Sequence, residues 1–211
     1  MDELSIKTFC LGDLFNNCYL VFHKQSKKGF IVDAPAPTDE VKEFIHSQNL
    51  EIVFILLTHA HFDHIGGLKD YPFPFYIYKK DFPLLKDPQL NGSAFFNHPI
   101  IIRKKPLLYE LDKPLYFNNY LCPLGYPIEV IHTPGHTPGS VSLKLNKWLF
   151  SGDTLFLDSI GRTDIPQASR ETLVKSIKEN LLILPPNTSV YPGHGASTTI
   201  AREAKSNPFL R

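Results

Sequence analysis

Cysteine is scarce in this sequence, which has three cysteines in 211 residues: Cys10, Cys18 and Cys122. Their number is odd and no two of them form a C-x-x-C pair, so neither a disulfide framework nor a thiolate zinc site is expected. We predict a reduced, partly buried thiol at each of the three positions.

Long apolar runs are absent as well. The sequence has no stretch of about 18 consecutive apolar residues, which excludes the usual signal for a membrane-spanning helix. The first residues, MDELSIKTF, are acidic and lack the apolar core of a signal peptide. The sequence therefore predicts a cytoplasmic protein with no membrane partner.

Charge of either sign is not in excess. Lys and Arg number 22 and Asp and Glu number 21, which gives a net charge of +1. No electrostatic argument therefore supports a nucleic-acid partner. Hydrophobic residues make up 43% of the chain, which is enough for a buried core, and the length suits one domain over residues 1–211. The oligomeric state is left open.

Strands and helices alternate along the chain. Apolar runs bounded by turn residues predict strands at 4–9, 17–23, 29–33, 52–57, 74–78, 128–132, 140–145, 147–152 and 188–193. A short helix is predicted after an N-cap at Thr38, and two more at 169–182 and 199–206. This order is typical of sheets flanked by helices, an α+β layered domain.

Histidines are concentrated in one short segment, LLTHAHFDHIGG (residues 56–67), directly after an apolar run. It contains His59, His61, Asp63 and His64. Chance alone would place H-x-H-x-D-H in roughly one of a thousand chains of this composition. His59 and His61 are two residues apart, so their rings project to the same side of an extended segment. The pattern indicates a metal site.

Three later segments supply further candidate ligands. HTPGHTPGS, FSGDTLF and VYPGHGA each follow a predicted strand and carry His136, Asp153 and His194 on a Gly- or Pro-containing loop. Imidazole and carboxylate groups bind zinc, iron and manganese. Together with the first segment they give seven candidates, which is too many for one tetrahedral metal with an open position. The set suits two metals that share a carboxylate.

The motifs THAHFDH, TPGHT, SGDTLF and YPGHG, in this order, resemble the metallo-β-lactamase superfamily. The resemblance is greatest to short glyoxalase II-like hydrolases (hydroxyacylglutathione hydrolases). Three further segments of this chain also match that subgroup: GRTDIP, DPQLNGS and NPFL. It implies a single-domain αββα sandwich with the metals at one edge, between the sheets. The sequence ends at Arg211, so the helical C-terminal domain of full-length glyoxalase II enzymes is expected to be absent.

The resemblance also implies roles for the candidate ligands. It assigns His59, His61 and His136 to a first metal, and Asp63, His64 and His194 to a second, with Asp153 as the bridge. The implied metals are two divalent ions, zinc first, with iron or manganese as alternatives. The implied activity is hydrolysis of a small-molecule thioester such as S-lactoylglutathione, by attack of a metal-bridging hydroxide that Asp63 also orients. A thiolate leaves without a proton donor, because a thiol has a pKa of about 8.5.

Other activities stay open within this resemblance. In mononuclear iron persulfide dioxygenases one iron is held by the residues that match His59, His136 and Asp153. Lactones and other esters are alternative substrates for a hydrolase. Zinc β-lactamases of the best-known kind are disfavoured, because they lack a match to His64 and place a cysteine on the second metal. A metal-binding protein without enzymatic activity is the least favoured interpretation.

Several residues outside the motifs carry weaker expectations. His132 is predicted to be a supporting or core histidine rather than a ligand. Asp33 is either a support for a ligand histidine or a simple loop aspartate, and Thr58 is expected to stabilise its loop. Arg162 and Asp164 are expected to form a structural pair near the site.

The segment from residue 81 to residue 110 is predicted to border the substrate, through Phe95, Phe96 and Tyr109. Basic residues flank it, and we interpret them as a solvated surface rather than an anion site: Lys79, Lys80, Arg103, Lys104 and Lys105. The identity of the thiol carrier is not indicated by the sequence.

Overall fold

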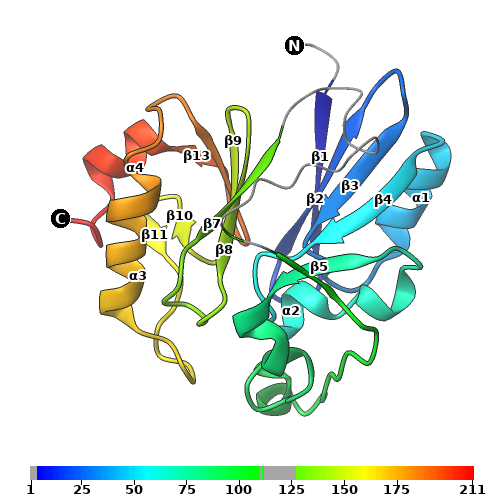
Figure 1. Ribbon diagram of the computed structural model, residues 1–211, viewed down its shortest axis with the longest axis horizontal. Coiled ribbons are helices and arrows are strands. Elements are labelled where there is room, and N and C mark those ends of the chain that lie inside the picture. Colours follow the sequence, from blue (N-terminus) through cyan, green and yellow to red (C-terminus); the bar gives the residue numbers. More distant parts are fainter. Residues whose placement is uncertain (1–3, 110, 112–126) are drawn as a thin grey trace.

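The computed structural model describes residues 4–109, 111 and 127–211. It contains two sheets that face each other, with helices on both outer sides (Figure 1). The first sheet has the spatial order β1 (Leu4–Leu11), β2 (Asn16–His23), β3 (Lys28–Val32), β4 (Glu51–Leu56), β5 (Phe75–Tyr78) and β6 (Leu107–Tyr109). The second has the order β13 (Thr198–Thr199), β12 (Ser189–Pro192), β9 (Trp148–Gly152), β8 (Val141–Leu145) and β7 (Ile128–His132).

Helices cover the outer faces of the sheets. The first sheet carries α1 (Asp39–Ser47) and α2 (Phe62–Ile65), with the 3-10 segments η1 (Leu68–Asp70), η2 (Lys79–Leu85) and η3 (Ser93–Phe96). The second carries α3 (Arg170–Ser176), a π-helical turn η4 (Ile177–Leu181) and α4 (Ile200–Ser206), beside the hairpin β10 (Leu155–Phe156) and β11 (Ser159–Ile160). The architecture is therefore the predicted αββα sandwich in a single domain.

Alternation along the strands builds three apolar layers. On β2, Leu20 packs toward the helices of the first sheet, whereas Val21 packs between the sheets. On β9, Phe150 packs between the sheets, whereas Leu149 packs with Leu173 and Ile177 beneath the outer helices. A strand buried on both faces needs a continuous apolar run, which explains why the run at 52–57 was readable as a central strand.

Most predicted elements are confirmed, with local differences. Thr38 precedes α1, but its side chain makes no capping hydrogen bond, so the predicted capping contact is wrong. The helix predicted at 169–182 begins after Ser169, whose side chain accepts a hydrogen bond from the N–H of Thr172. It changes to a π-helical turn at Ile177. Periodicity does not distinguish these forms, because the buried stripe continues through both.

The cysteine prediction needs one correction. Cys18 is a buried free thiol, as expected, but Cys10 is exposed. It lies near the end of β1 with its side chain on the outer surface, since neighbouring residues of a strand face opposite sides. Cys122 lies outside the described residues.

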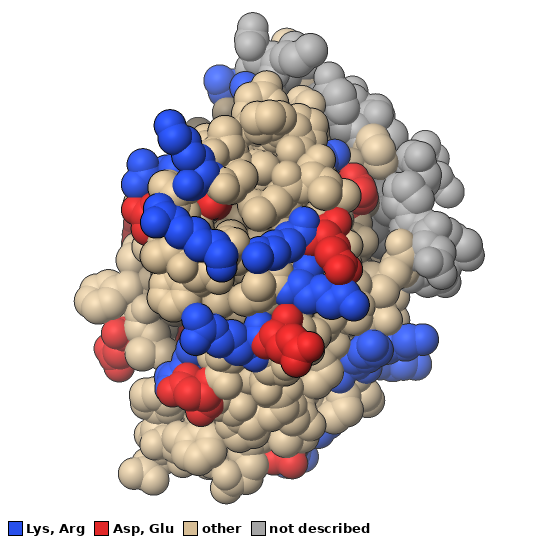
Figure 2. Space-filling view, turned by 90° about the vertical axis from the view of Figure 1, so that its left-hand side faces the viewer, with Lys and Arg blue, Asp and Glu red and all other residues tan. Residues whose placement is uncertain are grey.

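The outer surface over α3 and α4 carries charges of both signs (Figure 2). On the α3 side the chain carries Arg170, Lys175 and Lys178 together with Glu171 and Glu179, and all five are exposed. Among the helices that the structure describes, none combines the length and the apolar character needed to cross a bilayer.

Candidate metal centre

The candidate ligands lie on loops at one end of the two sheets. β4 ends at Leu56, a bend follows at Thr58, and the backbone is extended at His61 before α2 begins at Phe62. His59 and His61 therefore precede the helix, whereas Asp63 and His64 lie in its only turn. The change from loop to helix explains why the first two side chains and the last two can point in different directions, as their spacing suggested.

The second sheet brings its ligands to the same place. β9 and β12 are parallel neighbours, with Gly152 paired to Pro192, so Asp153 and His194 follow adjacent strand ends. A bridge between Asn16 and His194 then joins this edge to the first sheet. His136 reaches the cluster from the β7–β8 loop. All seven predicted residues are thus brought together, while their roles as ligands stay predictions.

The cluster contains three groups of side chains that could hold a metal ion. Within each group the ligand atoms lie within 4.8 Å of one another; the groups are His59, His61 and His136; His59, His64 and Asp153; and Asp63, His64 and His194. The first and third share no residue. Asp153 lies between them, with Oδ2 at 3.5 Å from Nε2 of His136 and 3.6 Å from Nε2 of His194.

Unpaired buried atoms test whether metal ions fit this cluster. Nε2 of His59, Nε2 of His64 and Oδ1 of Asp153 are buried and have no hydrogen-bond partner within the described part of the chain. An unsatisfied buried polar atom costs about 1–3 kcal/mol. A cation among these lone pairs would satisfy all three, so the donor set fits divalent metals.

Gly193 shows how closely the backbone approaches this centre. A β-carbon at this position would lie 2.1 Å from Oδ1 of Asp153 and 2.8 Å from Cε1 of His64. No side chain fits there without moving one of the two candidate ligands. The glycine of YPGHG is therefore required by close approach rather than by its backbone angles.

In three of the candidate ligand histidines, the ring nitrogen Nδ1 is held by a hydrogen bond to a neighbouring carboxylate or carbonyl. Nδ1 of His64 donates to Oδ2 of Asp33 at 2.8 Å. Nδ1 of His136 donates to the carbonyl of Arg162, and Nδ1 of His194 to the carbonyl of Leu14, both at 2.9 Å. Such contacts fix the tautomer and leave Nε2 directed at the centre.

Asp33 is the best connected of these supporting groups, which decides between the two interpretations of it. Its carboxylate accepts hydrogen bonds from the N–H and the O–H of Thr58 and from His64, all at 2.8 Å. Because the Thr58 hydroxyl donates to Asp33, its oxygen accepts from Nδ1 of His59 at 3.1 Å. One buried carboxylate therefore supports a candidate ligand of each metal.

We expect Asp33→Asn to weaken metal binding by about 10- to 100-fold, the usual effect of losing such a partner. The amide keeps the shape of the carboxylate but removes the charge behind His64. Competition against a fluorescent chelator would measure the dissociation constants. Asp70→Asn is the matched control. Asp70 is exposed on η1, and its replacement by Asn removes the same charge at a site away from His64. Equal affinities in the two variants would contradict a supporting role for Asp33.

Burial and neighbouring charges set the protonation of the cluster. Burial lowers the pKa of His61 to about 3, and it also lowers the pKa of His59 and of His136. These rings are therefore neutral near pH 7, the form that binds metals. Burial opposes ionisation of Asp63, but the His64 and His194 rings outweigh it and lower the pKa of Asp63 to about 2.

His64 behaves differently from the other rings. Its complete burial disfavours the charged form, but the carboxylates of Asp33, Asp63 and Asp153 together raise its pKa above the ordinary value. The same His64 charge lowers the pKa of Asp153, again against the effect of burial. The centre thus concentrates negative charge around one imidazole, as a cation site requires.

Asp81 is a buried site residue that the sequence did not indicate. Its carboxylate accepts hydrogen bonds from the N–H of Ala60 at 3.1 Å, the hydroxyl of Thr137 at 2.7 Å and the N–H of Gly139 at 2.6 Å. Burial raises its pKa to about 6, although these three donors oppose the rise. It joins the loop of His59 and His61 to the loop of His136. Nothing in the local sequence KKDF marks it.

A cleft of about 540 Å³ lies over the cluster. Its walls include Phe95 and Phe96, as predicted for this segment, together with Phe156 and Ile165. Tyr109 does not line it. Its ring is buried on β6, where the hydroxyl donates to the carbonyl of Leu57 at 3.2 Å, so that prediction is wrong.

The sequence predictions for charged and histidine residues near the cleft are confirmed in part. Arg162 and Asp164 form an exposed ion pair at 2.9 Å on the rim of the cleft. His132 is no ligand, since Nε2 donates to the carbonyl of Pro138 at 3.0 Å. Of the basic residues taken as a solvated surface, Lys104 is half-buried and donates to the carbonyls of Tyr71 and Phe73.

A four-layer sandwich with a His/Asp cluster where its two sheets meet defines a class of metal-dependent enzymes. The chain belongs to the metallo-beta-lactamase superfamily, whose family model matches residues 11–194. It is a metallo-hydrolase of that superfamily, similar to the "Probable metallo-hydrolase YqgX" of Bacillus subtilis, with 37% identity over 95% of this chain and 94% of that one. It is 33% identical to the "Hydroxyacylglutathione hydrolase GloC" of Haemophilus influenzae, over 92% of both chains.

Two solved structures are also similar along nearly their whole length. The crystal structure of the "BLEG-1 B3 metallo-beta-lactamase" has a TM-score of 0.90 and 38% identity, covering 98% of this chain and 99% of that one. The crystal structure of "TTHA1623 in a di-iron-bound form" has a TM-score of 0.79 and 34% identity, covering 97% of this chain and all (100%) of that one.

Proposed function

We propose that the protein is a dinuclear metal-dependent thioester hydrolase, with S-lactoylglutathione as its leading substrate. The observation that carries the proposal is the pair of separate ligand triads, with the Asp153 carboxylate between them. The similarity to the hydrolase GloC supports the thioester class. The proposal includes a cytoplasmic location and a free small-molecule substrate, in keeping with a net charge of +1.

The residues divide into two sites in this proposal. His59, His61 and His136 would hold the first metal, and Asp63, His64 and His194 the second, with Asp153 shared. Bound divalent metals supply Lewis acidity, which polarises a carbonyl and lowers the pKa of a coordinated water to about 7. Zinc is our first choice, and the similarity to a di-iron structure supports iron as the alternative.

The chain itself positions the reacting groups. Asp63 accepts a hydrogen bond from Nδ2 of Asn16 at 3.2 Å, and its Oδ2 lies 3.1 Å from Nε2 of His194. These contacts fix a carboxylate that would accept a hydrogen bond from the attacking hydroxide and orient it. As the C–O bond forms and the C–S bond breaks, the electron pair leaves with sulfur as a thiolate. No acid is needed for this departure, because the conjugate thiol has a pKa of about 8.5.

β-Lactam hydrolysis is the second candidate function. The observation in its favour is the similarity to BLEG-1, which exceeds the similarity to GloC in sequence identity. A β-lactam expels an amine rather than a thiolate, and amines are poor leaving groups unless they gain a proton. The seven charged or imidazole groups at the centre are all committed to the two triads and the bridge, so thioesters suit this site better.

The test is a substrate panel on protein reloaded with zinc: S-lactoylglutathione, a simple lactone and a chromogenic cephalosporin. We expect kcat/KM for the thioester to exceed that for the β-lactam by at least about 100-fold, or 2.7 kcal/mol in transition-state binding. Chelator-treated protein is the control and should be inactive on all three. Turnover of the cephalosporin without turnover of any thioester would reject the proposal.

A further inference from the structure

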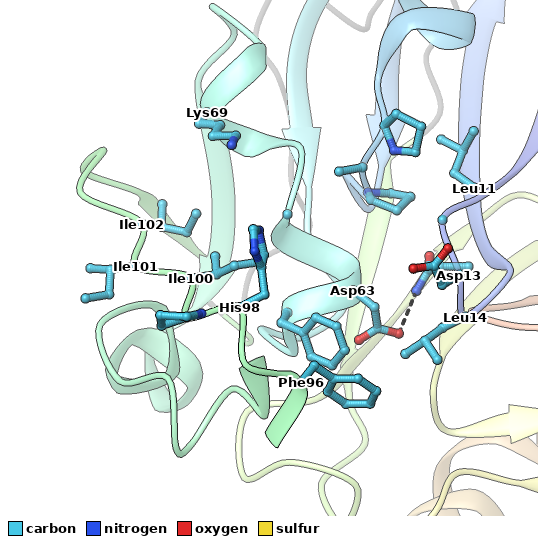
Figure 3. A pocket seen from close by; sticks show the side chains of 18 residues that line it. Leu11, Asp13, Leu14, Asp63, Lys69, Phe96, His98, Ile100, Ile101 and Ile102 are labelled. Atoms are coloured by element: carbon cyan, nitrogen blue, oxygen red, sulfur yellow. Dashed lines mark hydrogen bonds between the residues drawn. The ribbon is translucent and has the colours of Figure 1, made fainter. Parts of the chain in front are cut away.

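A second hollow opens beside the metal centre and has a volume of about 710 Å³. We call it the side groove. Its walls come from the β1–β2 turn, from residues 35–37 and from residues 98–102, and α2 with η1 forms its floor (Figure 3). The carboxylate of Asp63 lies at the point where the side groove meets the candidate metal centre.

The floor of the side groove is one face of a helical segment. Phe62 begins α2, Gly66 follows the last residue of α2, and Lys69 lies in η1; all three line the side groove. A β-carbon at Gly66 would lie 3.2 Å from the carbonyl oxygen of Phe62, 3.5 Å from Cβ of Ala36 and 3.7 Å from Cδ1 of Ile100, and would thus enter the space between the floor and two walls. Glycine keeps the groove open along its length.

The side groove adjoins the cleft over the metal centre. Leu14, Phe62, Asp63 and Phe96 line both hollows. The rings of Phe62 and Phe96 contact each other with centroids 4.7 Å apart, and they form a partition between the two spaces. A carbonyl held beside Asp63 therefore has two directions in which its substituents can extend.

The lining of the side groove is mostly apolar; its polar members are Asn16 and His98, and its charged members are Asp13, Asp63 and Lys69. Phe96 and Ile101 are 55% and 49% exposed on its rim, and exposed apolar side chains grouped in this way mark ligand sites. Figure 3 shows Lys69 at one end, with Asp13 and Asp63 toward the other. Within the described part of the chain, Lys69 forms no ion pair.

We propose that the side groove binds the acyl arm of the thioester substrate and that Lys69 selects acyl chains with a carboxylate at their far end. The proposal rests on the proposed thioester hydrolase function. Lys69 follows Asp63 by six positions along α2 and η1, and a rise of about 1.5 to 2.0 Å per residue places them about 9 to 12 Å apart along the floor. A chain of medium length would span this distance, with its carbonyl at Asp63.

The distribution of polar groups assigns the two arms of the substrate. A peptide-like thiol carries several charged and amide groups, which need several partners. The cleft provides charged partners through the exposed pair of Arg162 and Asp164 on its rim. The side groove offers Lys69 at one end and walls that are mostly apolar, which suits an acyl chain.

Glutathione thioesters of acetate, octanoate and octanedioate (one carboxyl group left free) test the proposal. For zinc-loaded wild type we expect kcat/KM to rise at least about tenfold from acetyl to octanoyl, since each buried methylene contributes up to about fourfold. The octanedioyl thioester should exceed the octanoyl thioester by about threefold, as expected for one exposed ion pair.

Two variants separate the walls of the side groove from its charge. Lys69→Glu should lower the ratio of octanedioyl to octanoyl kcat/KM by about five- to tenfold. Lys24→Glu is the matched control, because Lys24 is exposed in the β2–β3 turn, at the far end of β2, and should preserve all ratios. Gly66→Val should lower the ratio of octanoyl to acetyl kcat/KM to near one.

Binding of the acid products gives a measurement that needs no turnover. Calorimetry should show that Lys69→Glu weakens octanedioate binding by a similar factor and leaves octanoate binding as in wild type. Equal kcat/KM for the three thioesters, with ratios unchanged in the variants, would reject the acyl groove and leave thioester hydrolysis standing. An equal loss on all three thioesters in Lys69→Glu would place the thiol arm there and also reject it. No turnover of any thioester would reject the function itself.

Discussion

Asp153→Ala protein is expected to lose at least about 1,000-fold in kcat and to hold fewer than two metal equivalents, since the paired-metal chemistry depends on both ions. Oδ1 of Asp153 lies 3.3 Å from Nε2 of His64, and Oδ2 lies 3.5 Å from Nε2 of His136. One carboxylate thus faces a candidate ligand of each metal. The Asp153→Ala substitution removes the carboxylate that lies between Nε2 of His64 and Nε2 of His136.

Elemental analysis of protein purified without chelator measures this effect, and wild type should contain close to two equivalents per chain. Asp158→Ala is the matched control. Asp158 is partly exposed and pairs with Arg202 at 2.7 Å on the outer side of the second sheet, so its loss should leave metal content unchanged. Two equivalents retained in Asp153→Ala would show that Asp153 does not bridge the sites.

His64→Ala and His194→Ala should each abolish thioester hydrolysis and remove one metal equivalent. The first triad, of His59, His61 and His136, is intact in both variants, so one metal should remain. Asp63 then keeps its contact with Asn16 but loses a partner imidazole. Metal content and kcat are measured on the same samples. His46→Ala, an exposed histidine of α1, is the control.

The same variants distinguish a hydrolase from a persulfide dioxygenase. A dioxygenase that uses one iron at the positions of His59, His136 and Asp153 has no need of a second triad. Iron-loaded wild type should therefore consume no oxygen when given glutathione persulfide. Oxygen consumption at a catalytic rate, retained in His64→Ala, would refute the dinuclear hydrolase.

The cluster of candidate ligands was predictable from sequence because each member is marked locally. His59, His61, Asp63 and His64 lie within six residues, and the later three each follow an apolar strand in a Gly-containing loop. The sandwich was predictable for a related reason, since burial of both sheet faces leaves continuous apolar runs in the central strands.

The supporting groups were less predictable, because they depend on contacts between distant segments. Asp33 reaches Thr58 and His64 only after β3 and β4 pair, and sequence left its role undecided. Asp81 contacts residues 21 and 56 positions away. Tyr109 was placed at the substrate by its aromatic character, but an aromatic ring fills a core equally well.

Two of the anchors behind the ligand histidines are main-chain carbonyls, those of Leu14 and Arg162. The side chains of the same two residues line the cleft. Support for the imidazoles is thus independent of side-chain identity at both positions, whereas the shape and charge of the cleft depend on it directly. Substitutions there can alter which molecules enter while the histidines keep their orientation. Such a division lets substrate range diverge among related proteins without loss of the metal-binding scaffold.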